Sequence, residues 1–596
     1  MFRLRIGDTP RFGQGGSNML IYIAALAVSV ADGAVPTASI EAGKPQDALA
    51  AAEAAVAAGE DSEAARLLRP LVERSDANAA LLLAGVYNRG RGVAEDHGEA
   101  LRLLRLAADA GVTRALVEIG LMHENGSGVA KDPAKANTFY REAADKGDSL
   151  GRLYLGMNIR SGVGTSVDHL EAVRWLKLAA ADGETTAIYL LGVAHDYGQG
   201  VEENDTEALR LFRQCAALRD SDCERSVGLM YDLGRGVAKD EREGFRWFKA
   251  ASEHGNIEAF VDVGHDYRYG TGVAKDEAQA LAWYRKAADA GSARGLTALA
   301  EAHRWGIGMK EDPVRARGLY EQAIAAESGP ALAGLGEMLE WGAGGDVDLA
   351  RAADLYRRAA DAGEVDAIER YAYALANGRG VAKDLKAAFE WYRKGAGRGG
   401  ARSMNGLGFA YEVGEGVAKD VAQAVAWYRK AADLDEPTAI TNLGVMTFNG
   451  RGIDKDAKEA RRLFERAAGL GDSRGRYLLG TMLIDGDGGA KDVGRGFALI
   501  RRSADDGDAD ALTQLGALTE EGIGTKADPP AALGLYQKAA ALGDALAMRY
   551  LGINHSEGIG TAVDRKAAEA WFRKAIEAGD DEAAGLLADL KLRGAD

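Results

Sequence analysis

A pair of glycines separated by one residue returns along most of the chain at a fixed interval of 36 residues. The first glycines of the pairs are Gly90, Gly126, Gly162, Gly198, Gly234, Gly270, Gly306, Gly342, Gly378, Gly414, Gly450, Gly486, Gly522 and Gly558. Fourteen copies without an insertion or deletion predict one structural unit repeated fourteen times. Such units bury their apolar faces by stacking on their neighbours.

One copy, residues 115–150, shows what each unit contains. Apolar side chains such as Ile119 recur at helical spacing and predict a first helix. Gly126 and Gly128 follow, where the backbone must leave the helix and reverse. A second amphipathic stretch begins at Pro133 and predicts a second helix. The fold class is therefore all-α: an α/α superhelical solenoid of about fourteen 36-residue helix-turn-helix repeats with degenerate capping units.

The loop between the two helices contains glycine, lysine and aspartate, which could also form a phosphate or metal site. Aspartate ends this loop in nearly every copy, directly before the second helix, and this is the preferred position of an N-cap. A ligand site would be needed once, whereas this loop occurs fourteen times. The copies with the sequence GVAKD supply the predicted structural caps Asp132, Asp240, Asp276, Asp384 and Asp420.

The two ends of the chain differ from the repeats. Arg3, Arg5 and Arg11 precede an apolar run over residues 19–31, which is typical of a secretory signal peptide. An uncleaved N-terminal anchor is the alternative. We therefore expect a periplasmic or secreted protein. The predicted segments are a signal peptide (1–31), a linker (32–42), a degenerate N-terminal capping repeat (43–78), fourteen repeats (79–582) and a C-terminal capping helix (583–596).

Charge and motif content exclude several function classes. The formal net charge of −17 opposes binding to nucleic acid, and nothing predicts stable membrane insertion of the mature chain. The chain has no HExxH, GxSxG, Ser-x-x-Lys or GxxxxGK[ST] motif. We therefore predict no enzymatic activity, no cofactor, and no catalytic, cofactor-binding or metal-ligating residue.

Residues 403–435 follow the pattern A-x-x-x-L-G-x-x-Y-x-x-G-x-G-V-x-x-D-x-x-x-A-x-x-W-Y-x-K-A-A-x-x-G and depart from it only at Ser403 and Asp435. In this pattern the chain resembles the Sel-one-like repeat family, relatives of the tetratricopeptide repeats. The resemblance implies an α/α superhelix that serves as a scaffold for protein–protein interaction. It identifies no particular partner.

Two cysteines, Cys215 and Cys223, are the only ones in the chain. They replace small residues at the end of one second helix and the start of the next first helix. In an exported protein this spacing suggests a disulfide that joins consecutive helices, and the resemblance supports it. Two free cysteines that act as small core residues are the alternative.

Departures from the repeat are where function is expected. Tyr269, Trp305 and Trp341 stand directly before the Gly-x-Gly pair in three consecutive copies. Over the same stretch Glu301 and Glu337 replace apolar residues. Aromatic side chains beside carboxylates are typical of binding hot spots, so we predict that these five residues bind a partner. The alternative is that the rings pack over neighbouring loops.

The function predicted from sequence is a non-enzymatic, exported scaffold or adaptor that mediates protein–protein interactions. By family resemblance it would regulate envelope signalling or assembly from the periplasm. A cell-wall carbohydrate-binding protein that stacks sugars on the same rings is the alternative, and an enzyme is the third hypothesis.

Overall fold

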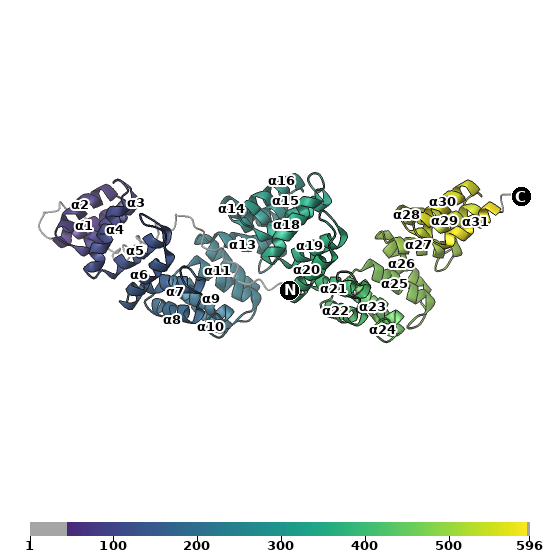
Figure 1. Ribbon diagram of the computed structural model, residues 1–596, viewed down its shortest axis with the longest axis horizontal. Coiled ribbons are helices and arrows are strands. Elements are labelled where there is room, and N and C mark those ends of the chain that lie inside the picture. Colours follow the sequence, from purple (N-terminus) through teal and green to yellow (C-terminus); the bar gives the residue numbers. More distant parts are fainter. Residues whose placement is uncertain (1–44, 593–596) are drawn as a thin grey trace. The chain divides into compact units, whose positions relative to one another are not determined.

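The computed structural model describes residues 45–592, which form thirty-one helices and, within that range, no strand (Figure 1). The chain divides into two compact units at residue 311. Unit 1 comprises the described residues up to 311, and unit 2 comprises those from 312 onward.

The helices of unit 1 are α1 (Pro45–Ala58), α2 (Asp61–Glu73), α3 (Ala77–Arg89), α4 (His97–Asp109), α5 (Thr113–Asn125), α6 (Pro133–Asp145), α7 (Ser149–Ser161), α8 (His169–Ala181), α9 (Thr185–Tyr197), α10 (Asp205–Ala216), α11 (Ser221–Leu233), α12 (Glu241–Glu253), α13 (Ile257–Tyr269), α14 (Glu277–Asp289) and α15 (Ala293–Trp305).

The helices of unit 2 are α16 (Pro313–Ala325), α17 (Gly329–Trp341), α18 (Leu349–Ala362), α19 (Val365–Asn377), α20 (Leu385–Gly397), α21 (Ala401–Val413), α22 (Val421–Asp433), α23 (Pro437–Asn449), α24 (Ala457–Gly469), α25 (Ser473–Asp485), α26 (Val493–Asp505), α27 (Ala509–Glu521), α28 (Pro529–Ala541), α29 (Ala545–Glu557), α30 (Arg565–Glu577) and α31 (Glu582–Leu592).

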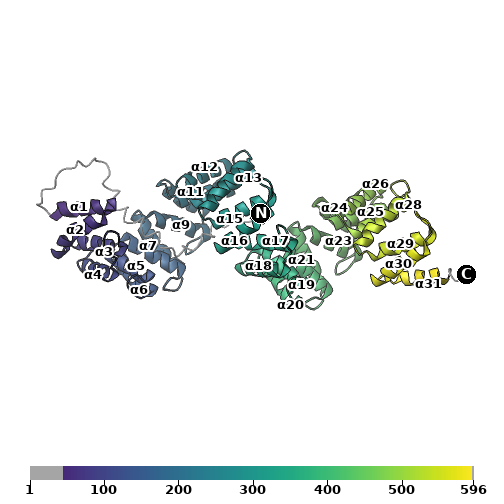
Figure 2. The same ribbon diagram turned by 90° about the horizontal axis from the view of Figure 1, so that it is seen from above.

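The repeat predicted from sequence is confirmed as a helix-turn-helix unit. The first helices of the repeats are the odd-numbered helices α3 to α29, and the second helices are the even-numbered helices α4 to α30. Within each unit every helix packs against the helix before it and the helix after it (Figure 2). Each unit is therefore an α/α solenoid.

The loop between α21 and α22 shows why the glycine pair recurs. Gly414 ends α21 in the left-handed conformation, with a φ of 86°. Gly416 also has a positive φ, and a Cβ there would lie 2.1 Å from the carbonyl oxygen of Leu385, at the start of the preceding second helix. Only glycine combines this backbone conformation with such a close approach. The second glycine thus packs each loop against the preceding repeat.

The aspartate at the end of each loop caps the following helix. Asp420 accepts hydrogen bonds from the backbone N–H groups of Ala422 and Gln423, at 3.0 Å each. The other four predicted caps accept backbone N–H groups as follows: Asp132 from Lys135, Asp240 from Arg242 and Glu243, Asp276 from Ala278 and Gln279, and Asp384 from Ala387. A side-chain acceptor at this position satisfies N–H groups that the first turn of a helix leaves without partners.

Where both helices of a repeat belong to one unit, the core of the repeat lies between them. In α21 and α22 the side chains of Leu407, Ala424, Tyr428 and Ala431 are buried. Small alanines let the helices approach closely, while one large side chain per repeat, in most repeats a ring, fills the remaining space. The equivalent ring is Tyr140, Tyr284 or Tyr536 in other repeats.

The ends also contain helices. Within the range predicted for the N-terminal capping repeat, α1 and α2 pack against α3, and α31 packs against α30 at the other end. The predicted signal peptide and linker lie outside the described residues. None of the helices in the described range combines the length and the apolar character needed to cross a membrane.

Candidate functional site

The two cysteines lie in unit 1, where α10 is followed by α11. Cys215 and Cys223 are fully buried, their Cα atoms are 5.8 Å apart, and their sulfur atoms are joined in a disulfide. The bond links the end of one second helix to the start of the next first helix.

Two of the three predicted binding rings belong to unit 1. The side chains of Tyr269 and Trp305 are 64% and 58% exposed, so most of each ring does not pack over a neighbouring loop. The guanidinium of the preceding residue lies against each ring. Arg268 is 4.9 Å from the centre of the Tyr269 ring, and Arg304 is 4.4 Å from the centre of the Trp305 ring. The predicted carboxylate Glu301 forms an ion pair with Arg268 at 2.9 Å.

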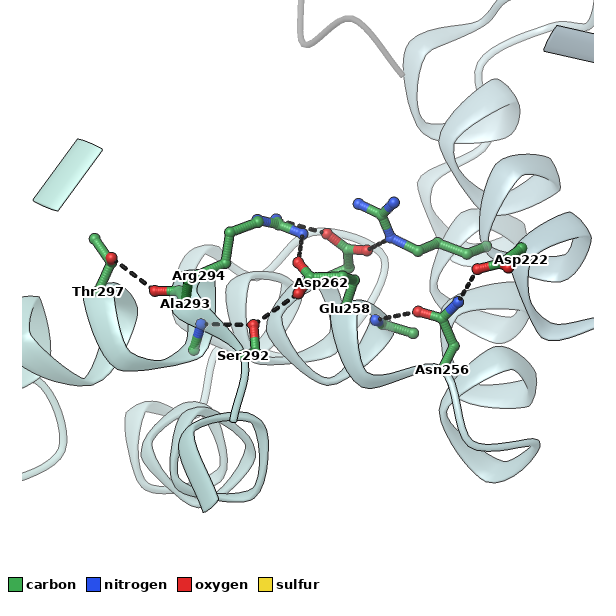
Figure 3. Close-up of polar contacts among 11 residues, drawn as sticks. Asp222, Asn256, Glu258, Asp262, Ser292, Ala293, Arg294 and Thr297 are labelled. Carbon is green, nitrogen blue, oxygen red and sulfur yellow. Dashed lines mark hydrogen bonds and ion pairs between the residues drawn. The ribbon is translucent and has the colours of Figure 1, made fainter. Parts of the chain in front are cut away.

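The first helices of unit 1 carry a ladder of charges that pair with one another (Figure 3). Asp262 on α13 accepts from Arg225 on α11 at 2.5 Å and from Arg294 on α15 at 2.9 Å. Arg294 also donates to Glu258 at 3.0 Å, and Ser292 donates to the same carboxylate at 2.7 Å. These contacts join three consecutive repeats.

The ladder keeps its central carboxylate ionised. Burial alone would raise the pKa of Asp262, which is only 8% exposed, but the guanidiniums of Arg225 and Arg294 outweigh burial and lower its pKa to about 2. Because two arginines neutralise Asp262, its negative charge is not available to bind a ligand.

Unit 2 has a groove of about 450 Å³ along its first helices. The groove is lined by residues of α17 to α23: Glu340, Trp341, Leu349, Ala352, Ala353, Tyr356, Glu369, Arg370, Tyr373, Ala374, Arg379, Tyr392, Arg402, Asn405, Gly406, Glu436 and Thr438. They come from four consecutive first helices, from the second helices α18 and α20, and, for Arg379 and Glu436, from the loops between helices.

Two small residues distinguish this groove. In three repeats a glutamate near the end of the first helix accepts a hydrogen bond from the tyrosine of the second helix: Glu124 from Tyr140, Glu340 from Tyr356 at 2.9 Å, and Glu412 from Tyr428. The glutamate's position in α19 is occupied by Ala376, which cannot make this contact with Tyr392. Gly406 has no side chain, so the Tyr392 ring lies directly against α21, where a Cβ would be only 2.7 Å from the ring.

Exposed rings border the groove. Trp341 is 70% exposed and Tyr373 is 49% exposed, and both line it. Phe409, at the position of α21 that corresponds to Tyr373, is exposed as well. Trp341 and Tyr373 therefore add exposed apolar surface to the groove, and exposed apolar patches mark interaction sites.

Most charges at one end of the groove are paired. Arg370 contacts the predicted binding residue Glu337 at 2.6 Å and Glu340 at 3.6 Å, and Arg379 contacts Glu340 at 3.3 Å. Both predicted carboxylates, Glu301 and Glu337, therefore take part in ion pairs within their own units.

Further along the groove the charges are not paired in this way. Glu369 is 8% exposed, and its carboxylate accepts the backbone N–H of Ser403 at 3.3 Å. Burial raises the pKa of Glu369 to about 7, and the nearby carboxylate of Asp366 adds to the shift. The guanidinium of Arg402, on the exposed side of α21, opposes the shift only in part.

Of the three predicted rings, Tyr269 and Trp305 belong to unit 1, whereas Trp341 belongs to unit 2 and lines its groove. Sequence reasoning missed Glu369, Tyr392 and the small residues that distinguish the groove. Comparison of each tyrosine of a second helix with the residue sixteen positions before it finds glutamate or arginine at the other tyrosines and alanine only before Tyr392.

No residues in the described range are arranged to hold a metal ion, since no three His, Cys, Asp or Glu side chains gather there. The groove combines aromatic walls with hydrogen-bonding and charged groups. Such a surface can bind a segment of another molecule.

Comparison with known families identifies the repeat. The Sel1 repeat profile matches residues 77–112, 113–148, 150–184, 185–220, 221–256, 261–292, 293–328, 329–364, 365–400, 401–436, 437–472, 473–508, 509–544 and 545–580. These matches cover most of the chain. No curated protein sequence matches it.

Several solved structures are similar. A protective antigen of uropathogenic Escherichia coli with an SLR fold is 26% identical, with a TM-score of 0.46, over 80% of this chain and 97% of that one. A Sel1 repeat protein from Oxalobacter formigenes is 32% identical, with a TM-score of 0.37, over 41% of this chain and 97% of that one. An immunity protein from Pseudomonas aeruginosa is 24% identical, with a TM-score of 0.28, over 37% of this chain and 83% of that one.

Sel1 repeats form a non-catalytic scaffold family whose members generally mediate protein–protein interactions. With fourteen matched repeats and the corresponding helix pairs, this chain belongs to the Sel1 repeat family.

Proposed function

We propose that this protein is an exported, non-enzymatic scaffold and that the groove of unit 2 binds a segment of a partner protein. The observation that carries the proposal is the combination of the groove with two exposed rings, Trp341 and Tyr373, in its wall. Rigid helices hold these rings in place before a partner arrives, so binding costs little ordering entropy.

Export is part of the same proposal. The buried pair Cys215 and Cys223 supports it, because disulfides persist in oxidising compartments. The predicted signal peptide points the same way, and a role in envelope signalling or assembly would follow from that location. Two titratable thiols in denatured protein taken from the periplasm would contradict the oxidised pair.

The groove assignment is tested by comparing two double variants after crosslinking in the native cell envelope. Trp341→Ala with Tyr373→Ala removes the rings of the groove. Tyr269→Ala with Trp305→Ala removes two equally exposed rings from unit 1 and is the matched control. We expect the first variant to lose most of the captured partner and the second to keep it, with helical content unchanged in both.

Unchanged partner recovery with the groove variant would contradict the assignment. Sedimentation with purified peptidoglycan addresses the carbohydrate alternative. If the wild-type protein sediments with peptidoglycan and the groove variant does not, the same rings bind cell-wall glycan rather than protein.

A further inference from the structure

The charged residues that line the groove differ in the ion pairs and hydrogen bonds that they form. Glu340 is held by Arg370, Arg379 and the hydroxyl of Tyr356. Glu436 caps α23 by accepting the backbone N–H of Ala439. These groups stabilise the fold, which leaves Glu369 and Arg402 as the charges that a partner can meet.

Glu369 and Arg402 are not equivalent. Glu369 is fixed in the wall by burial and by the N–H of Ser403, whereas Arg402 extends from an exposed position. An opposite charge gains more beside a buried carboxylate than beside a solvated guanidinium, because the local dielectric is lower. The raised pKa of Glu369 shows that its carboxylate lacks full compensation by a cation.

The surroundings of Glu369 also favour a cation. Tyr373 follows four residues later on α19, so its ring lies on the same face of the helix. Aromatic faces attract ammonium and guanidinium groups, and Arg379 already lies 6.0 Å from the centre of this ring. The net charge of −17 further favours a basic partner over an acidic one.

We propose that the groove receives an arginine or lysine side chain from an extended segment of the partner, with the cation beside Glu369 and against the ring of Tyr373. The proposal rests on the proposed function and names the chemistry of the partner. The groove continues past Arg402 to Thr438 on α23, so it accommodates an extended segment on both sides of the basic residue.

Three fluorescein-labelled, end-blocked heptapeptides test this proposal. They share the sequence Gly-Ala-Leu-X-Leu-Ala-Gly, with X as arginine, glutamine or glutamate. Fluorescence anisotropy against the full chain measures their affinities at mildly alkaline pH, where Glu369 is largely ionised. We expect the arginine peptide to bind about tenfold more tightly than the glutamine peptide, and the glutamate peptide to bind most weakly.

Two variants test whether Glu369 causes the preference for the arginine peptide. Glu369→Gln should lower the affinity for the arginine peptide about tenfold and leave the glutamine peptide unchanged. Arg402→Gln is the matched control, and it should leave the arginine peptide as tightly bound or tighter. Circular dichroism of both variants checks that the fold is intact.

The proposal is overturned if the glutamate peptide binds most tightly and Arg402→Gln abolishes that binding, since the groove would then read an acidic segment. It is also overturned if the arginine peptide shows no saturable binding up to about 1 mM. Either result leaves the proposed scaffold function standing, because that function is judged by partner recovery with the ring variants.

Discussion

Arg294 in unit 1 and Arg402 in unit 2 occupy the same position of the repeat, yet their surroundings differ. Arg294 pairs with Asp262 on the preceding first helix. In unit 2 the position of Asp262 is taken by Arg370, which pairs with Glu337 and Glu340 instead. The charge at this one position therefore differs between the units. Asp262 can pair with the arginine of the next first helix, whereas Arg370 cannot pair with Arg402. The same repeat fold therefore carries a surface of paired charges in unit 1 and a groove in unit 2.

The largest expected difference between the two surfaces follows from removing their central carboxylates. Asp262→Ala should destabilise α11 to α15 by about 3 kcal/mol, because two partly buried arginines lose their shared partner. Glu369→Ala should cost far less, because no arginine depends on it in the same way. Hydrogen exchange of the two units measures both effects, and an equal loss in both would contradict the comparison.

The two carboxylates should also respond to pH with opposite signs. The pKa of Glu369 is raised to about 7, so the folded state keeps a proton that the unfolded state releases, and local stability falls as pH rises towards 7. The pKa of Asp262 is lowered to about 2, so its contribution is present above pH 4 and is lost as pH falls towards 2. Each slope is at most about 1.4 kcal/mol per pH unit.

Hydrogen exchange of α19 and α13 across this pH range measures the two slopes. Glu369→Gln should abolish the slope at α19 and leave that at α13 unchanged. A slope at α19 that persists in the variant would show that another group titrates there.

Closing the groove should stabilise unit 2. Ala376→Glu restores the carboxylate that Tyr392 lacks, and the new hydrogen bond should add about 1.5 kcal/mol, by analogy with Tyr428 and Glu412. Thermal unfolding checks the gain. The gain should vanish when Tyr392→Phe is added, and if it persists, the paired hydroxyl is not its cause.

The smallest expected effect concerns the Gly-x-Gly loop, which recurs in the repeats of both units. Asp420→Ala removes an N-cap and should cost about 1 kcal/mol, confined to α22. Lys419→Ala, one residue earlier, should have no measurable effect. Hydrogen exchange of α22 distinguishes the two variants, and equal losses would point to a role for the loop beyond capping.

These comparisons show what the sequence could predict. The interval of 36 residues, the glycine pairs and the aspartates predicted the helix pairs because each depends on residues close together in the chain. The loop at 414–420 is an example, since Gly414 ends one helix and Asp420 caps the next.

The groove could not be predicted from residues close together in the chain. It depends on the absence of a glutamate at Ala376, which becomes apparent only when this position is compared with Tyr392, sixteen residues later, and on Gly406, which lies against the Tyr392 ring. The ion pairs of Glu301 and Glu337 depend on arginines of neighbouring helices, which single positions do not show.

We infer that a partner lies in the groove of unit 2 and not on the surface of unit 1 that carries Tyr269, Glu301 and Trp305. A photo-crosslinking amino acid placed at Tyr373, and separately at Glu301 in the equivalent repeat position, tests it directly in the native envelope. We expect the partner to be crosslinked from position 373 and not from position 301. A crosslink from position 301 without one from position 373 would contradict it.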